Sequence, residues 1–112
     1  MKEKITIPIY SATLWVVVAD NIKRERKKWD YMFGEDDGKW TALCCYTGNG
    51  DFGLFFRDNA TIEDIAHEVF HCTHRVLDWA SVKFDKDNHE SAALLNGWLM
   101  GKVMEVVKKL KG

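Results

Sequence analysis

The chain has 112 residues, 46% of them hydrophobic, and its 16 basic and 17 acidic side chains leave a formal net charge of −1. This balance excludes a strongly charged surface, so neither nucleic acid nor an anionic membrane is expected as a partner. The one basic run, Lys23–Lys28, is interrupted by Glu25 and is interpreted as a solvated helix face. Residues 1–112 can bury one real core, which predicts a single domain.

The sequence shows no pattern of membrane insertion or secretion. No run approaches the roughly 18 apolar residues that span a bilayer, and Met1–Tyr10 lacks the apolar core of a secretory signal. The cysteines are odd in number, and Cys44 and Cys45 are adjacent in a predicted strand, so reduced thiols are expected. We therefore expect a cytoplasmic protein, while the sequence leaves its oligomeric state open.

The N-terminal half predicts strands around one helix. Lys4–Ile9 and Thr13–Asp20 are β-rich runs that are expected to pair as a hairpin. Pro8 indicates that the first of them is an edge strand or begins irregularly. A helix is expected from Asp20 or Asn21 to about Phe33, because apolar residues recur on one side of it.

Two further strands complete the predicted sheet. Lys39–Tyr46 and Phe52–Arg57 are joined by Thr47–Asp51, which contains an Asn-Gly turn signal. Together these elements predict an α+β fold with an antiparallel sheet of about four strands.

The stretch Thr61–His71 opens a helix that fades near Trp79–Ser81. Thr61 is a suitable N-cap, and Asp64 three residues later gives an approximate capping box. Apolar positions then recur at helical spacing: Ile62, Ile65, Ala66, Val69, Thr73, Val76, Leu77 and Ala80.

Beside that stripe lies an HExxH motif, His67-Glu68-Val69-Phe70-His71. Residues i and i+4 of a helix lie one turn apart on the same side, so His67 and His71 can bind one ion. Catalytic zinc commonly takes three protein ligands and acidifies a bound water, whose proton a neighbouring carboxylate can accept. Glu68 is that candidate base. The alternative interpretation is a solvated face that happens to carry two histidines.

A last helix is expected from about His89 to Leu110, packed on the HExxH helix. One of its faces carries Glu90, Ala93, Gly97 and Gly101, and small residues let another helix approach closely. Packing this face on the HExxH helix would carry Glu90 towards the two histidines.

Glu90 therefore has two interpretations. It follows His71 after 18 residues and can return a carboxylate to the metal from the second helix of a hairpin. It can also complete a capping box by bonding back to the backbone N–H of Asp87. Given the upstream motif, a metal ligand is the preferred assignment.

These residues carry a family resemblance over about Ala60–Leu99. HEVFH, followed by the glutamate of NHESAALLNGWL, resembles the gluzincin branch of the zincin metallopeptidases and small zincin-like proteins of phages and prophages. Weaker similarity to the phage-type proteins lies in IPIYSATLWVVVAD. The resemblance implies a zinc-dependent peptidase with His67, His71 and Glu90 as ligands and Glu68 as general base.

The chain also departs from that family. It has no room for a second lobe that closes the substrate cleft, and Leu94 stands where many gluzincins have a polar residue. The histidines would then be oriented by Asp78, Asp85 or Asp87. The candidate transition-state donors are Tyr10, Tyr31, Tyr46, His74 and His89. The large aromatics Trp79, Phe84 and Trp98 are expected to clamp the two last helices together.

The sequence thus predicts a single zincin-like α+β domain that binds Zn²⁺ and hydrolyses an amide bond in a peptide or protein substrate. An edge strand, Phe52–Arg57, is expected to align that substrate. The rival prediction is a non-catalytic zincin-like binding or assembly protein of phage or prophage origin. The small size of the chain favours this rival, whereas the intact Glu68 favours the enzyme.

Overall fold

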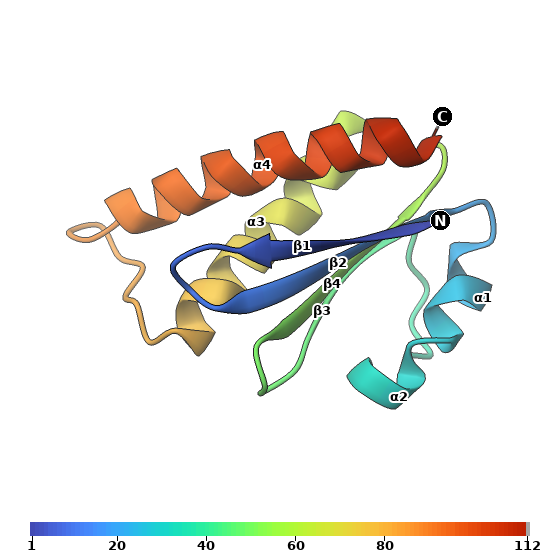
Figure 1. Ribbon diagram of the computed structural model, residues 1–112, viewed down its shortest axis with the longest axis horizontal. Helices are drawn as coiled ribbons and strands as arrows, with labels where there is room; N and C mark the ends of the chain where they lie inside the picture. Colours follow the sequence, from blue (N-terminus) through green and yellow to red (C-terminus); the bar gives the residue numbers. More distant parts are fainter. Residues whose placement is uncertain (112) are drawn as a thin grey trace.

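A mixed four-stranded sheet with helices on both faces makes up the computed structural model, which describes residues 1–111 (Figure 1). The elements in chain order are β1 (Lys2–Ile7), β2 (Ala12–Ala19), α1 (Ile22–Lys27), α2 (Asp30–Phe33), β3 (Ala42–Tyr46), β4 (Asp51–Arg57), α3 (Ile62–Trp79) and α4 (Glu90–Lys111). The α+β class is confirmed. None of the helices in this part of the chain has the length and apolar content that crossing a bilayer requires.

The sheet order is β1-β2-β4-β3, and it corrects the prediction of a purely antiparallel sheet. β1 pairs with β2 and β3 with β4 as antiparallel hairpins, whereas β2 and β4 are parallel. The reason is the crossover: after β2 the chain passes through α1 and α2 to the far edge, and the second hairpin returns beside β2. β4 is therefore central, so the expectation that Phe52–Arg57 is an edge strand was wrong. β1 is an edge strand, which is one of the two alternatives that Pro8 indicated, although Pro8 itself lies just after the strand.

Two hydrophobic clusters lie on the two faces of this sheet. α3 and α4 cover one face, where Leu14, Val16 and Leu54 are among the residues with no exposed surface. α1 and α2 cover the other face around Trp29 and Phe55. Strands buried on both faces explain the nearly continuous apolar runs of β2 and β4. Cys44 and Cys45 contact opposite clusters, which confirms the strand alternation.

The predicted first helix is two short helices, α1 and α2. The chain breaks at Lys28 and Trp29 because the Trp29 side chain is buried against Trp15 and Phe55, with ring centroids 5.1 and 5.9 Å away. The buried side chain of Arg26, only 3% exposed, connects the two helices across this break. Its guanidinium donates to Asp30 Oδ1 at 2.9 Å and to the Gly34 carbonyl at 3.0 Å.

α4 packs through a different face from the one expected. Its buried side chains include Leu95, Leu99 and Val103, whereas a Cβ added at Gly97 or Gly101 would meet nothing within 4 Å. The small-residue stripe therefore makes no close contact with α3, although Gly101 lines an open hollow together with Ile62 and Ile65 of that helix. The prediction that this stripe packs on α3 was wrong. The larger residues Leu95, Leu99 and Val103 bury more apolar area, and burial of apolar area decides how an amphipathic helix is rotated.

The three large aromatics do not clamp α3 to α4. Trp79 packs on Phe52 and on the β3–β4 turn, where a Cβ at Gly50 would come within 2.7 Å of its ring. Phe84 and Trp98 lie at the surface, 40% and 38% exposed. The contact between α3 and α4 is made instead by aliphatic residues of both helices.

Candidate metal centre

The outward face of α3 carries the two motif histidines. Thr61 caps the helix as predicted, with its hydroxyl accepting from the Asp64 N–H at 3.2 Å and the Asp64 carboxylate accepting from the Thr61 N–H at 3.0 Å. Val69, Cys72 and Val76 are buried on the opposite face. The cap and the buried stripe together fix how α3 is rotated about its axis. His67 and His71 consequently point to solvent.

The two imidazoles are close enough to share one ligand. His67 Nε2 and His71 Nε2 are 3.2 Å apart, with ring centroids separated by 4.8 Å. At that distance one ring N–H can donate to the other ring nitrogen when both are neutral and in complementary tautomers. The same distance suits two ligands of a single metal ion. The two rings thus lie on the same side of α3, as the i, i+4 spacing predicts, and their role as metal ligands stays a prediction.

Glu68 lies one position round the helix, between the histidine face and the sheet. Its side chain is 13% exposed, and Oε2 lies 3.8 Å from His67 Nε2. Burial raises the pKa of Glu68 above its ordinary value, while His67, His71 and the backbone N–H of Cys44 act in the opposite direction. A carboxylate with a raised pKa beside two imidazoles is suited to accept and return a proton.

Two thiols lie behind Glu68 in the layer between α3 and β3. Cys72 has no exposed surface, and a hydrogen bond to Cys72 together with burial raises the pKa of Cys44 far above its usual value. Thiols that resist ionisation are poor metal ligands and poor nucleophiles. Cys44 is therefore poorly suited to either role, and Cys72 is a free cysteine enclosed in the core, in agreement with the prediction of reduced, mostly structural thiols.

Aromatic side chains border the site on its two sides. Phe84, from the loop after α3, packs edge-on against Phe70 and His74, with centroids 6.1 and 5.7 Å away. On the β3 side the Arg75 guanidinium lies 4.5 Å from the Tyr46 ring centroid. Neither contact was predicted, because each joins residues that lie far apart in the sequence and no local periodicity signals them.

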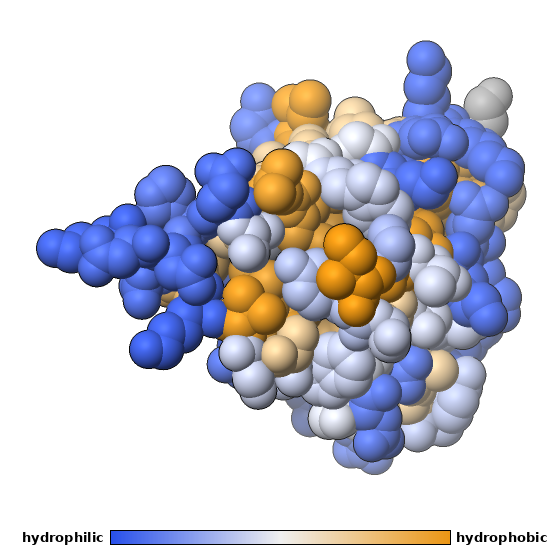
Figure 2. All heavy atoms as spheres, turned by 60° about the vertical axis from the view of Figure 1, so that its left-hand side comes forward, coloured by the Kyte–Doolittle hydropathy of each residue, from blue (hydrophilic) through white to orange (hydrophobic). Residues whose placement is uncertain are grey.

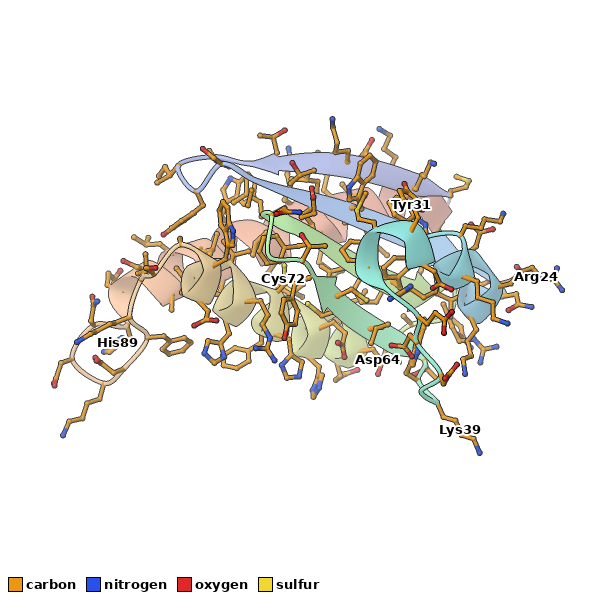
Figure 3. The ribbon with its side chains drawn as sticks, turned by 90° about the horizontal axis from the view of Figure 1, so that it is seen from below. Arg24, Tyr31, Lys39, Asp64, Cys72 and His89 are labelled. Carbon is orange, nitrogen blue, oxygen red and sulfur yellow. The ribbon has the colours of Figure 1, made fainter. Side chains whose placement is uncertain are left out.

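Glu90 is not brought to the histidines. α3 and α4 run in opposite directions, since the side chains of Thr73 and Asn96 are hydrogen-bonded at 2.9 Å, while Lys111 Nζ donates to the Ala60 carbonyl at 3.3 Å. A rise of about 1.5 Å per residue then places Glu90 roughly 18 Å along the helix axes from His67. In Figure 3, His89 and Asp64 accordingly lie at opposite ends of the helix pair.

The capping alternative for Glu90 is not formed either. The backbone N–H of Asp87 donates to Asp85 Oδ1 at 2.9 Å, so it is not available to Glu90. Glu90 itself is exposed. Among residues 1–111, no three His, Cys, Asp or Glu side chains lie close enough to hold one ion.

The structure also separates the predicted donor and orienting residues. Tyr31 lies on α2, on the far side of the sheet (Figure 3), and Tyr10 lies beside α4. Only Tyr46 and His74 flank the histidine face. Of the aspartates proposed to orient the histidines, Asp78 lies on α3 beside His74, in an open hollow of about 320 Å³.

Comparison of the chain with family models, with curated proteins and with solved structures finds no match.

Proposed function

We propose that the protein is a zinc-dependent metallopeptidase whose metal is held by His67 and His71, with Glu68 as general base. The observation that carries the proposal is the 3.2 Å separation of the two Nε2 atoms. Zinc–nitrogen bonds of about 2.05 Å at a tetrahedral angle require two nitrogen ligands to lie roughly 3.3 Å apart. The observed separation of the two nitrogens matches that distance.

Glu68 supplies the acid–base chemistry of the proposed reaction. Zinc, when bound, would polarise the scissile carbonyl and acidify the attacking water. Glu68 accepts a proton from that water and returns it to the amine as the C–N bond breaks. The Glu68 carboxylate is only partly solvated because its side chain is 13% exposed. Burial also raises the pKa of Glu68 towards the range of a general base that works near neutral pH.

Because β4 is central in the sheet, β3 is the strand best placed to align an extended substrate. β3 is the edge strand next to α3, and the N–H of Cys44 on it faces the Glu68 carboxylate. A peptide that pairs with a sheet edge gains main-chain hydrogen bonds with little dependence on its sequence. The Tyr46–Arg75 contact at the end of this edge would bound the substrate on that side.

Glu90 as third ligand stays a prediction. Its first-turn position on α4 lies far from the histidines, so binding would require the segment from residue 80 to residue 91 to rearrange. A water or the substrate carbonyl could otherwise complete the coordination.

The rival class is a non-catalytic zincin-like binding or assembly protein. The observation that favours it is the same remoteness of Glu90, because two exposed imidazoles alone make a weaker site than three ligands. In that case Glu68 would serve no catalytic purpose.

The deciding experiment compares zinc-loaded wild type with Glu68→Gln on a panel of unstructured peptides, with cleavage followed by mass spectrometry. Loss of a general base typically lowers the rate by about 10²–10⁴-fold, so we expect cleavage by the wild type and almost none by the variant at equal zinc content. Equal cleavage by both forms would refute the proposed role of Glu68. No cleavage by either, with partner capture that survives Glu68→Gln, would favour the rival.

A further inference from the structure

The outward face of α4 is uncharged and partly apolar, although it lies at the surface. The eleven residues from Ser91 to Gly101 include no Asp, Glu, Lys or Arg. Leu94 is nevertheless 67% exposed and Trp98 38% exposed. A surface helix normally presents charged residues on its solvent side, so this face has the composition of one that is covered.

The two glycines on this face have no role within the chain. A Cβ at Gly97 or Gly101 would meet nothing within 4 Å, and neither residue has a positive φ. Glycine in a helix interior is destabilising relative to alanine. These positions therefore carry a cost in the monomer, and the room beside them is available to side chains from outside it.

A groove continues the face towards the β1–β2 turn. It has a volume of about 470 Å³ and is lined by Ile7, Pro8, Ile9, Tyr10, Ser91, Leu94, Leu95 and Trp98. Ile9 at its rim is 94% exposed and has a φ of 72°, an unfavourable angle for a β-branched residue. Figure 2 brings this end of the molecule forward and shows hydrophobic residues gathered at its middle, with hydrophilic side chains on either side.

We infer that a second copy of the chain covers this face, with the two α4 helices packed antiparallel about a two-fold axis. The sequence of the face is self-complementary in that arrangement. An axis level with the Gly97–Trp98 bond sets Leu94 opposite Gly101 of the second copy and brings the two Trp98 side chains next to each other beside the axis. Leu94 thus meets a glycine and Trp98 meets its own counterpart with one choice of axis, and the same patch of both copies is used, as an isologous interface requires.

The charges at the two ends of α4 favour the same arrangement. The first turn is acidic, with Glu90, and the last turn is basic, with Lys108, Lys109 and Lys111. Antiparallel packing brings Glu90 to within about one turn of Lys108 of the second copy, on the same face, and also opposes the two helix dipoles. Glu105 comes level with Glu90 of the second copy, but the two carboxylates lie on opposite sides of the central row formed by Leu94 and Gly101. A membrane is a poorer occupant, because an acidic residue borders the face.

The size of the face sets the strength of the expected dimer. Contact from Glu90 to Glu105 extends over roughly 22 Å of helix, to which the groove adds a further strip. This lies at the low end of specific interfaces, so we expect a weak, reversible dimer.

Sedimentation equilibrium of the full chain between about 1 and 500 µM tests the inference. A monomer of 13.0 kDa should pass to a species of twice that mass as the concentration rises. The double substitution Gly97→Glu/Gly101→Glu should leave a folded monomer throughout, because both positions are open in the monomer. Gly48→Glu, at a glycine that is equally open but lies in the β3–β4 turn, should dimerise like the wild type. A wild type that stays monomeric, or a double variant that dimerises equally well, would overturn the inference.

Cysteine cross-linking tests the register. Leu94→Cys/Gly101→Cys places thiols opposite each other across the proposed axis and should give a covalent dimer on mild oxidation. Either substitution alone leaves the thiols about seven residues, or roughly 10 Å, apart and should give none. The wild type controls for the native cysteines, of which Cys45 and Cys72 are buried. Equal cross-linking by a single variant would exclude this antiparallel register.

Discussion

α3 and α4 are neighbouring helices, and each carries a sequence pattern that predicts part of a metal site: the HExxH motif on α3 and the stripe that begins with Glu90 on α4. Only α3 places these residues where the pattern predicts. In α3 the motif histidines come within 3.2 Å of each other through the helix geometry alone. In α4 the residue that should join them, Glu90, depends on where along their lengths the two helices meet and on which face of α4 packs inward. That face is chosen by Leu95, Leu99 and Val103, and the choice turns the glycine stripe to solvent.

The difference separates two kinds of site geometry. A pair at i and i+4 is fixed by the helix itself and needs only a helix that forms, which Thr61 and Asp64 support here. A ligand on a second helix needs the correct rotation, crossing point and loop. A metal can provide part of that ordering when it binds, since its binding free energy is available to the folded state. Experiments on zinc binding therefore compare the two helices directly.

The largest expected effect is on zinc binding by α3. His67→Ala/His71→Ala should reduce zinc content from about one per chain to near zero, because it removes both imidazoles from the proposed site. Mutation of a residue that only orients a metal ligand typically lowers metal affinity by about 10–100-fold. Loss of two ligands should therefore lower zinc affinity by more than that. Elemental analysis after dialysis against buffered zinc measures it.

His74→Ala is the matched control for this double variant, because His74 is also exposed on α3, one turn beyond His71. It should leave the zinc content unchanged. Retention of a full zinc equivalent by the double variant would show that the histidine pair is only a hydrogen-bonded surface pair.

A smaller effect is expected on the α4 side. In the observed arrangement Glu90→Gln should change zinc affinity by less than about threefold, because the carboxylate is remote from the ion's charge. Competition with a chromophoric chelator measures the affinity, and Asp87→Ala serves as a control for changes in the loop before α4. A loss of more than about tenfold, specific to Glu90→Gln, would show that zinc recruits the first turn of α4 as the sequence pattern predicts.

Local chemistry explains which parts of the fold could be predicted. The cap at Thr61, the hairpin of the first two strands and the alternation of Cys44 and Cys45 follow from residue types within a few positions of one another. The position of β4 does not, because the strand order depends on where the crossover places the second hairpin. The predicted edge and the antiparallel sheet both failed for that reason.

The same limit applies to the candidate site. Spacing along the sequence gave the histidine pair and Glu68 beside it. The contacts of Phe84 with His74 and of Arg75 with Tyr46 join separate elements and leave no periodic signal. Even the break between α1 and α2 follows from a tertiary contact, the burial of Trp29, which overrides a helical pattern.

The smallest expected effect concerns the stability of the metal-free protein and tests whether Glu68 is as enclosed as its position against β3 suggests. Burial raises its pKa in the folded state, so folding favours the protonated form. The wild type therefore has this stability in full below the unfolded pKa, about 4.3 for glutamate, and loses it as the pH rises through the folded value. Glu68→Gln has no carboxyl group that loses a proton at this position. In the presence of a chelator it should therefore unfold at a higher urea concentration than the wild type at pH 7.5. The two urea midpoints should converge at about pH 4 and below. A wild type that is equal or superior at pH 7.5 would mean that the histidines and the Cys44 N–H outweigh burial, and that Glu68 is held as a carboxylate before any metal binds.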